Sequence, residues 1–227
     1  MRSLLITIDG PAGAGKTTVS RALAKRLSYT YVDTGALYRG IALAARDAGI
    51  DPDEETNLEN LFKTIALTCT KTPAGPRLSL NGVDISDKIR TPEIAMAASH
   101  ISAKPVVRRY LLTLQRRLGK DKGVIFEGRD MGTVVFPDAD VKFFLVADLK
   151  TRAARRFVEL GHKTEALSLE RVKKEMKIRD ENDSTRSIAP LKAAQDAVVI
   201  DSTALDVHEV VELMISHIRH HSSNVDS

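Results

Sequence analysis

The fold class is decided by one glycine-rich stretch near the N-terminus, Gly10-Pro11-Ala12-Gly13-Ala14-Gly15-Lys16-Thr17. It fits the phosphate-binding pattern of a glycine, four residues of any type, a second glycine, a lysine and a serine or threonine. Glycines let the backbone curl so that its N–H groups point inward at an anion. The apolar run Leu4–Ile8 before the stretch predicts a buried strand, and Thr17–Leu27 after it has the apolar period of a helix. The stretch is therefore predicted to be a P-loop.

The P-loop chemistry assigns roles to individual residues. Lys16 is expected to bridge the β- and γ-phosphates of a nucleotide, and the Thr17 hydroxyl to contact Mg²⁺, the only cofactor that the sequence implies. A helix that begins near Lys16 adds the partial positive charge of its N-terminus. The candidate ATP-binding residues are Gly10, Pro11, Ala12, Gly13, Ala14, Gly15, Lys16, Thr17 and Thr18.

Short apolar strands alternate with helical segments over most of the chain. We predict strands at Leu4–Ile8, Tyr29–Val32, Val124–Phe126, Val141–Val146 and Ala197–Ile200. This alternation indicates an α/β fold, a three-layer P-loop core with a five-stranded parallel sheet.

Two segments depart from the alternation. The first is rich in predicted strands, and its Asn81–Gly82 pair between Arg77–Leu80 and Val83–Ile85 is a strong hairpin signal. The second, Lys150–Asp183, is highly charged and predicts two helices around a mobile flap at Gly161–His162. Both segments are expected to be excursions from the α/β core.

Composition narrows the function classes without choosing among them. The chain has 227 residues, a formal net charge of +4 and one cysteine, so an internal disulfide is excluded. No apolar run reaches the length of a membrane span or an export signal, which predicts a cytoplasmic protein that does not bind membranes. Aromatic residues make up 4% of the chain, which argues against a stacking surface for single-stranded nucleic acid. The positive surplus is equally explained by arginines that bind phosphate.

Arginines follow two of the predicted strands. Arg39 lies just beyond Tyr29–Val32, and Arg129, with Asp130 beside it, follows Val124–Phe126. Ligands of parallel α/β sheets lie outside the carboxyl ends of the strands. We therefore expect these arginines to meet an acceptor phosphate near the P-loop.

From Ile6 to about Ile218 the sequence resembles the bacterial cytidylate kinases, a family of nucleoside-monophosphate kinases. The motifs that carry the resemblance are the P-loop, Asp33–Arg39, Ile89–Glu93, Gly128–Asp138 and Arg179–Leu191. The resemblance implies a P-loop core (1–35, 106–150 and 184–220), a nucleotide-binding arm (36–105) with a β-insert near 63–90, and a lid (151–183). Beyond the last helix, expected at Val207–Ile218, residues 221–227 are expected to form a flexible tail.

The resemblance also implies the function and the site. Phosphate would pass from ATP to CMP, and to dCMP, in a monomer whose partners are these small molecules. Lys16 and Arg129 are the candidate catalytic residues, joined by three lid arginines of which the sequence does not select one: Arg152, Arg155 and Arg156. The implied substrate-binding residues are Thr34, Arg39, Ser99, Arg108, Arg129, Asp130, Arg179, Asp183 and Arg186, with Arg39 and Arg129 on the acceptor phosphate.

The proposed base readers agree with the chemistry of cytosine. Asp130 can accept a hydrogen bond from the exocyclic N4 amine, and Arg108 can donate to O2 and N3. Uracil has an oxygen in place of N4, which would face the carboxylate lone pair to lone pair. The sequence departs from many relatives at Glu127, where they carry aspartate, and this leaves the metal surroundings open.

Three other functions remain as alternatives. A kinase for UMP or AMP would use the same scaffold. A nucleotide-hydrolysing switch would carry a guanine-reading Asn-Lys-x-Asp segment, which is absent from the sequence. A nucleic-acid binder would gather its cations on one face with aromatic residues between them, whereas the arginines here are scattered.

Overall fold

A computed structural model describes residues 3–72, 75–161 and 168–225 of the chain. The chain divides into two compact units, one of Met1–Tyr31 with Lys122–Ser227 and one of Val32–Asp121. Within the described residues, no helix is long and apolar enough to cross a membrane.

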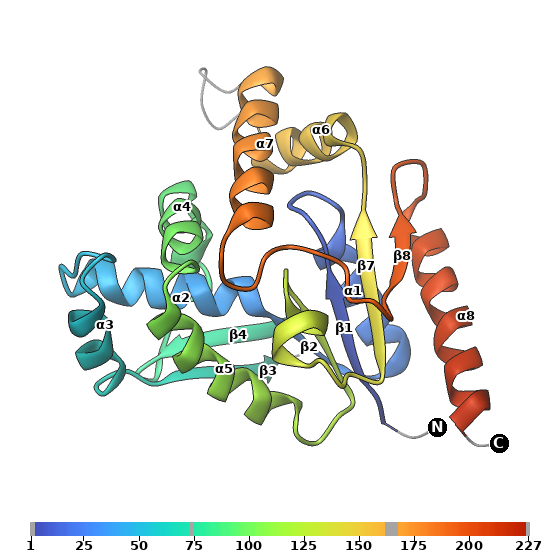
Figure 1. Cartoon of the computed structure of the whole chain (residues 1–227), viewed down its shortest axis with the longest axis horizontal. Helices are drawn as coiled ribbons and strands as arrows, with labels where there is room; N and C mark the ends of the chain where they lie inside the picture. Colours follow the sequence, from blue (N-terminus) through green and yellow to red (C-terminus); the bar gives the residue numbers. More distant parts are fainter. Residues whose placement is uncertain (1–2, 73–74, 162–167, 226–227) are drawn as a thin grey trace. The chain divides into compact units, whose positions relative to one another are not determined.

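The predicted five-stranded parallel sheet is confirmed (Figure 1). The strands lie in the order β2-β6-β1-β7-β8, and β1 pairs in parallel with both β6 and β7. Their bounds are β1 Leu5–Asp9, β2 Thr30–Asp33, β6 Val124–Glu127, β7 Val141–Val146 and β8 Val198–Asp201. β1 lies at the centre of the sheet and has a paired strand on each side. The loop that follows β1 therefore begins at a strand end that is held on both sides.

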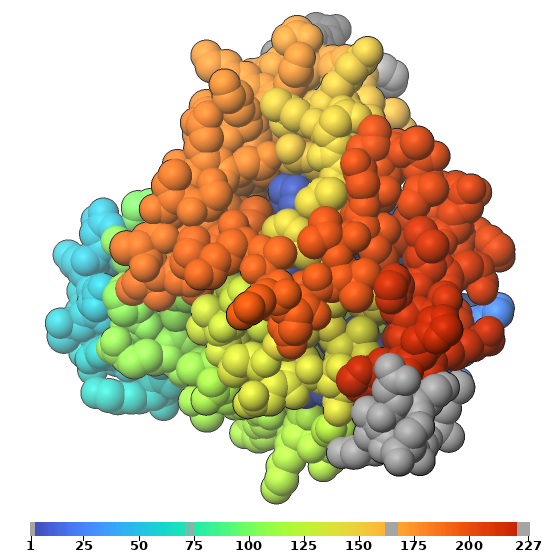
Figure 2. Space-filling view, turned by 45° about the vertical axis from the view of Figure 1, so that its right-hand side comes forward, coloured from blue at the N-terminus to red at the C-terminus, as the bar shows by residue number. Residues whose placement is uncertain are grey.

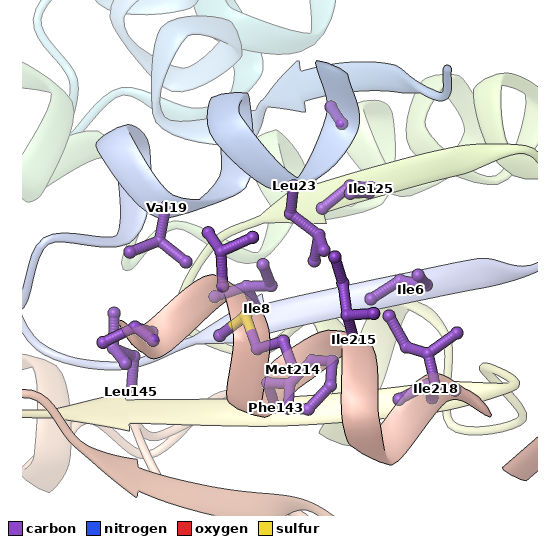
Figure 3. Close-up of a cluster of buried hydrophobic side chains, with 14 of the residues drawn as sticks. Ile6, Ile8, Val19, Leu23, Ile125, Phe143, Leu145, Met214, Ile215 and Ile218 are labelled. Carbon is purple, nitrogen blue, oxygen red and sulfur yellow. The ribbon is translucent and has the colours of Figure 1, made fainter. Parts of the chain in front are cut away.

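Helices α1 (Lys16–Leu27) and α8 (Val207–Val225) cover one face of this sheet. Figure 3 shows side chains of both helices meeting Ile6 and Ile8 of β1 in a single buried cluster. Thr7 points to the opposite face, as strand geometry requires, and a π-helical turn, η2 (Met131–Val135), lies there. The sheet is thus buried on both faces around β1.

The charged segment forms the two predicted helices, α6 (Leu149–Leu160) and α7 (Leu169–Thr185). They pack side by side (Figures 1 and 2) through a small apolar cluster of Ala153, Val172 and Met176. The flap predicted around Gly161–His162 falls at residues 162–167, outside the described residues, apart from Gly161, which ends α6.

The second unit contains the predicted β-rich insertion. Its antiparallel sheet is made of β3 (Leu67–Thr72), β4 (Gly75–Leu80) and β5 (Val83–Asp84). Asn81 and Gly82 both have positive φ, 50° and 80°, which the predicted tight hairpin requires. The helices are α2 Thr34–Asp47, α3 Glu55–Phe62, α4 Pro92–Ile101 and α5 Pro105–Gly119, with a 3₁₀ turn, η1, at Lys88–Arg90.

The insertion packs on α2 through a close approach at Gly40. A Cβ atom at this glycine would lie 3.0 Å from the side chains of Leu67 and Leu78. Local signals fix the helix starts: Asp33 caps α2 by accepting from the Ala36 amide, and Thr91 caps α4 ahead of Pro92.

The structure corrects the predicted end of the last helix. The sequence predicted a helix that ends at Ile218, followed by a tail, but α8 continues to Val225. Val210, Met214 and Ile218 dock this helix onto the sheet, and a docked helix extends readily through polar residues of ordinary propensity. Residues 226–227 of the predicted tail lie outside the described residues.

Candidate active site

The P-loop joins β1 to α1 through three glycines with positive φ. These are Gly10 at 143°, Gly13 at 74° and Gly15 at 86°. A Cβ atom at Gly10 would lie 2.0 Å from the carbonyl oxygen of Leu145, so no other residue fits there. Among the described residues no side chain caps α1, whose N-cap is Gly15. The first amides of the helix are therefore available to a phosphate.

Lys16 is buried at the start of α1, with 4% of its surface exposed. Its ammonium group donates a 2.6 Å hydrogen bond to the carbonyl of Pro11 at the other end of the loop. The pKa of Lys16 is lowered to about 7, first by burial and then by the nearby cations Arg129 and Arg179, against the opposite effect of Glu127 and Asp9. A phosphate bound in the loop would place negative charge beside Lys16 and would therefore raise its pKa again.

Thr17 and Glu127 link the P-loop to the end of β6. The Thr17 hydroxyl donates to Oε1 of Glu127 over 2.9 Å, and the Tyr31 hydroxyl donates to Oε2. Because the Thr17 hydrogen is used, the lone pairs of its oxygen stay available, as a hydroxyl ligand of Mg²⁺ needs. The described residues contain no group of three or more His, Cys, Asp or Glu side chains that could hold a metal. The Thr17 hydroxyl and the Glu127 carboxylate are oxygen groups, which is the kind of donor that Mg²⁺ takes together with nucleotide phosphates.

Four predicted substrate-binding residues of the first unit form one ionic network. Arg129 donates from Nε to Asp183 over 3.0 Å, and Arg186 lies 3.8 Å from Asp183 and 3.9 Å from Asp130. The Asp130 and Asp183 side chains are 3% and 9% exposed, so both carboxylates are held in the interior by arginines. The half-buried Arg179 lies on α7. The network joins the segment after β6 to the end of α7.

The predicted residues of the second unit make their own contacts. Arg39 pairs with Asp33 over 2.8 Å, while its buried Nε atom makes no hydrogen bond within the described residues. Arg108 donates to the Ser102 carbonyl over 3.0 Å and lies 5.8 Å from the centre of the Tyr38 ring. These contacts place Arg39 and Arg108 in half-buried positions.

Two further predicted residues of this unit lie at the ends of helices. Thr34 is buried at the start of α2. Ser99 lies near the end of α4, where its carbonyl accepts from the Ser102 hydroxyl over 2.8 Å. The backbone carbonyl of Ser102 also accepts the hydrogen bond from the Arg108 guanidinium, so Ser102 connects Ser99 to Arg108.

The three lid arginines lie in different surroundings. Arg152 is 7% exposed and donates to the Ala12 carbonyl of the P-loop and to Asp180 on α7. Arg155 donates to the backbone carbonyl of Ser202 over 2.7 Å. Arg156 pairs with Glu159 on its own helix and is 36% exposed. Of the three, Arg152 donates a hydrogen bond to the P-loop, and Arg155 lies close to the loop at Gly15.

Sequence reasoning missed several residues that the fold brings to this region. Asp180 accepts from Arg152, Ser202 donates to the P-loop at Ala14, Asp9 accepts from Met131 beside Asp130, and Tyr31 donates to Glu127, the partner of Thr17. Asp9 had a local signal, since it is a carboxylate at the end of an apolar strand directly before Gly10. Tyr31, Asp180 and Ser202 lie in segments that are distant in sequence from the P-loop, and no local motif marked them.

The chain is similar to cytidylate kinases over nearly its whole length. A family model described as cytidylate kinase matches residues 6–220. A cytidylate kinase of Geobacter sulfurreducens is 49% identical over 218 residues, covering 96% of this chain and 94% of the relative. One from Halalkalibacterium halodurans is 40% identical over 219 residues, covering 96% and 99%.

Solved structures with the same fold include other P-loop kinases. A gluconokinase from Sinorhizobium meliloti has a TM-score of 0.50 at 16% identity, covering 99% of this chain and 97% of that one. A shikimate kinase from Bacteroides thetaiotaomicron has a TM-score of 0.50 at 12% identity, covering 95% and 98%. At such identities the likeness concerns the fold alone.

Proposed function

Because the chain belongs to the cytidylate kinase family, we propose that it transfers the γ-phosphoryl group of ATP to CMP and dCMP. The observation that carries the proposal is the positive charge that lies beside the P-loop. Lys16 of the P-loop lies near enough to Arg129 and Arg179 for both arginines to lower its pKa. The buried Lys16 and the half-buried Arg129 and Arg179 bring positive charge beside the P-loop, as the transfer of a negatively charged phosphoryl group requires.

The P-loop would hold the donor. The uncapped amides of α1 and the Lys16 ammonium group would bind the β- and γ-phosphates of ATP, which replace the Pro11 carbonyl as the partner of Lys16. Thr17 would hold Mg²⁺, with its hydroxyl oriented by Glu127. When bound, Mg²⁺ would neutralise charge on the phosphate oxygens.

The ionic network would hold the acceptor. Arg129 is proposed to bind the acceptor phosphate, and Asp130 to accept from the N4 amine of cytosine. Arg179, Asp183 and Arg186 would contact the sugar and its surroundings. An incoming CMP would take over interactions that the network now makes within itself, so its buried charges stay partnered throughout.

For residues of the second unit, the proposed roles rest on the membership of the chain in the family. Arg39, whose Nε atom makes no hydrogen bond within the described residues, is proposed to bind phosphate. Ser99 and Arg108 are proposed to read the base, and Thr34 to contact the acceptor. The proposal requires no second chain, and we take the protein to be a monomer, which sedimentation would test.

The reaction needs no covalent intermediate. The acceptor phosphate is already ionised near neutral pH, so the residues of the chain have to align the two phosphates and balance charge rather than remove a proton. Arg152 is the lid arginine that we propose for this task, because it already lies against the P-loop.

An acceptor panel tests the proposal. ADP formation from Mg·ATP is measured with CMP, dCMP, UMP, AMP or no acceptor, and a Lys16→Met variant controls for contaminating kinases. The proposal predicts fast turnover of CMP and dCMP and a nearly inactive variant. Faster turnover of UMP or AMP would keep the scaffold but reject the role of Asp130. Equal ADP formation without an acceptor would instead support a nucleotide-hydrolysing switch.

A further inference from the structure

Asp9 is a buried carboxylate at the carboxyl end of β1, directly before the first glycine of the P-loop. Both of its oxygens accept hydrogen bonds from backbone amides of η2. Oδ1 accepts from Met131 over 2.9 Å and Oδ2 from Gly132 over 2.8 Å. These amides belong to the first turn of η2, where they have no partner within the turn. Asp9 thus fixes the start of η2 through two charge-assisted bonds.

The segment that carries Arg129 and Asp130 is held by β1 at both ends. At one end the Gly128 amide donates to the carbonyl of Ile8 over 3.1 Å. At the other end the amides of η2 donate to Asp9. Two consecutive residues of one strand therefore bracket the two residues that we propose to bind the acceptor.

The close approach of η2 to the sheet depends on Gly132. A Cβ atom there would lie 3.0 Å from Oγ1 of Thr7 and 3.2 Å from the Lys142 side chain. A side chain at this position would require Thr7 or Lys142 to shift by a few tenths of an ångström, so glycine suits the close approach of this amide to Asp9. The geometry of the segment is therefore set by the pair of Asp9 and Gly132.

We propose that Asp9 is a positioning residue, which holds Arg129 and Asp130 in register with the P-loop so that acceptor and donor phosphates meet. This role rests on the proposed function and deepens it. Because β1 runs straight from Asp9 into Gly10, one strand end sets both the donor loop and the acceptor segment. Both Asp9 oxygens accept from η2, next to Arg129 and Asp130, so loss of the carboxylate should weaken acceptor binding more than ATP binding.

The form of Asp9 that serves this role is the carboxylate. A protonated carboxyl turns one acceptor oxygen into a donor, which would face a backbone N–H group. Burial raises the pKa of Asp9 to about 6, with two backbone hydrogen bonds acting against it. Charged groups on the elements packed against Asp9 are Lys16 on α1, Glu127 on β6, Asp130 before η2 and Lys142 on β7.

The contact can be tested on the wild-type chain without any substrate. Amide ¹H–¹⁵N shifts of Met131 and Gly132 are followed from low to neutral pH in the wild type and in Asp9→Asn. Both amides should titrate with one shared midpoint in the wild type, and this titration should vanish in the variant. Amides that do not titrate, or that titrate equally in the variant, would overturn the proposal.

The positioning role is tested by separating two Michaelis constants. In Asp9→Asn, KM for CMP should rise about tenfold or more while KM for ATP changes less than about threefold. The matched control is Thr7→Val, on the same strand, because the buried Thr7 hydroxyl makes no hydrogen bond within the described residues. Both KM values should stay near those of the wild type in this control.

The possible failures are distinguishable. An active wild type with equal rises of both KM values in Asp9→Asn, or no rise at all, would overturn the role of Asp9 alone. A wild type that transfers phosphate to no nucleoside monophosphate would overturn the proposed function and this role with it. The amide titration reports on the contact in either case.

Discussion

The hydroxyl of Thr17 donates a 2.9 Å hydrogen bond to Oε1 of Glu127, which ties the P-loop to the end of β6. The other Glu127 oxygen accepts from Tyr31, so the carboxylate is fixed at both oxygens. Many relatives were expected to carry aspartate at this position. The longer glutamate side chain of this chain bonds directly to the P-loop. Glu127 sets the direction of the Thr17 lone pairs.

Thr17→Val should lower kcat/KM about 100-fold, because it removes the oxygen proposed to bind Mg²⁺ and the partner of Glu127. Thr68→Val is the matched control, since Thr68 is an exposed threonine of β3 to which no site role is assigned. It should stay within about twofold of the wild type. Steady-state rates over a Mg²⁺ titration provide the measurement. Equal losses in the two variants would contradict the proposed metal role of Thr17.

Arg152→Ala should lower kcat at least about tenfold and destabilise the fold by about 1–3 kcal/mol. The variant loses the bond to the Ala12 carbonyl and leaves the Asp180 carboxylate without its cation. Arg156→Ala should change kcat less than about threefold, because the Arg156–Glu159 pair is exposed. Turnover and urea unfolding of both variants are compared. A larger loss in Arg156→Ala would reverse the assignment.

Asp130→Asn should reduce kcat/KM for CMP about 100-fold and reduce it less for UMP. An asparagine amide can donate to the O4 atom of uracil, which the carboxylate cannot. Asp138→Asn, an exposed position in the same stretch, controls for the loss of a charge. The ratio of the two kcat/KM values is the readout. An unchanged ratio would show that Asp130 does not read the base.

The local parts of the fold followed from the sequence. The P-loop located β1 and α1, and the Asn81–Gly82 pair located the hairpin between β4 and β5. These features are specified by neighbouring residues, through glycine conformations and apolar periods. The strand order, with β1 between β6 and β7, depends on pairings between distant segments and had no local signal.

The candidate site likewise contains residues that local motifs predicted and residues whose positions depend on distant contacts. Lys16 and Thr17 were identified by a motif, and Arg129 by its place after a strand, and the resemblance supplied Asp183 and Arg186. The π-helical turn η2 was not predicted, because it depends on the distant contacts of Asp9 and Gly132. The burial of Arg152 could not be predicted from the sequence either, because the arginines of a charged helix usually lie in solvent.

The Asp9 carboxylate should destabilise the fold at neutral pH. Burial raises its pKa from the usual 3.8 to about 6, so within this window the folded chain binds the proton more tightly than the unfolded chain does. The contribution of Asp9 to stability is therefore greatest below pH 3.8 and falls as pH rises to about 6, by about 3 kcal/mol in all.

Urea unfolding of the wild type and Asp9→Asn at several pH values measures this contribution, because other titrations cancel in the difference. The free energy of unfolding of the variant relative to the wild type should increase between pH 4 and pH 7. A difference that stays flat over this range would contradict a raised pKa at Asp9.

The central claim is that the γ-phosphoryl group of ATP moves to CMP. The most direct test supplies ATP labelled in the γ-phosphate together with unlabelled CMP and follows the label by chromatography. The account predicts that the label appears in CDP at the rate at which ADP forms, and that Lys16→Met abolishes both. Label released as inorganic phosphate at the same rate with and without CMP would contradict it.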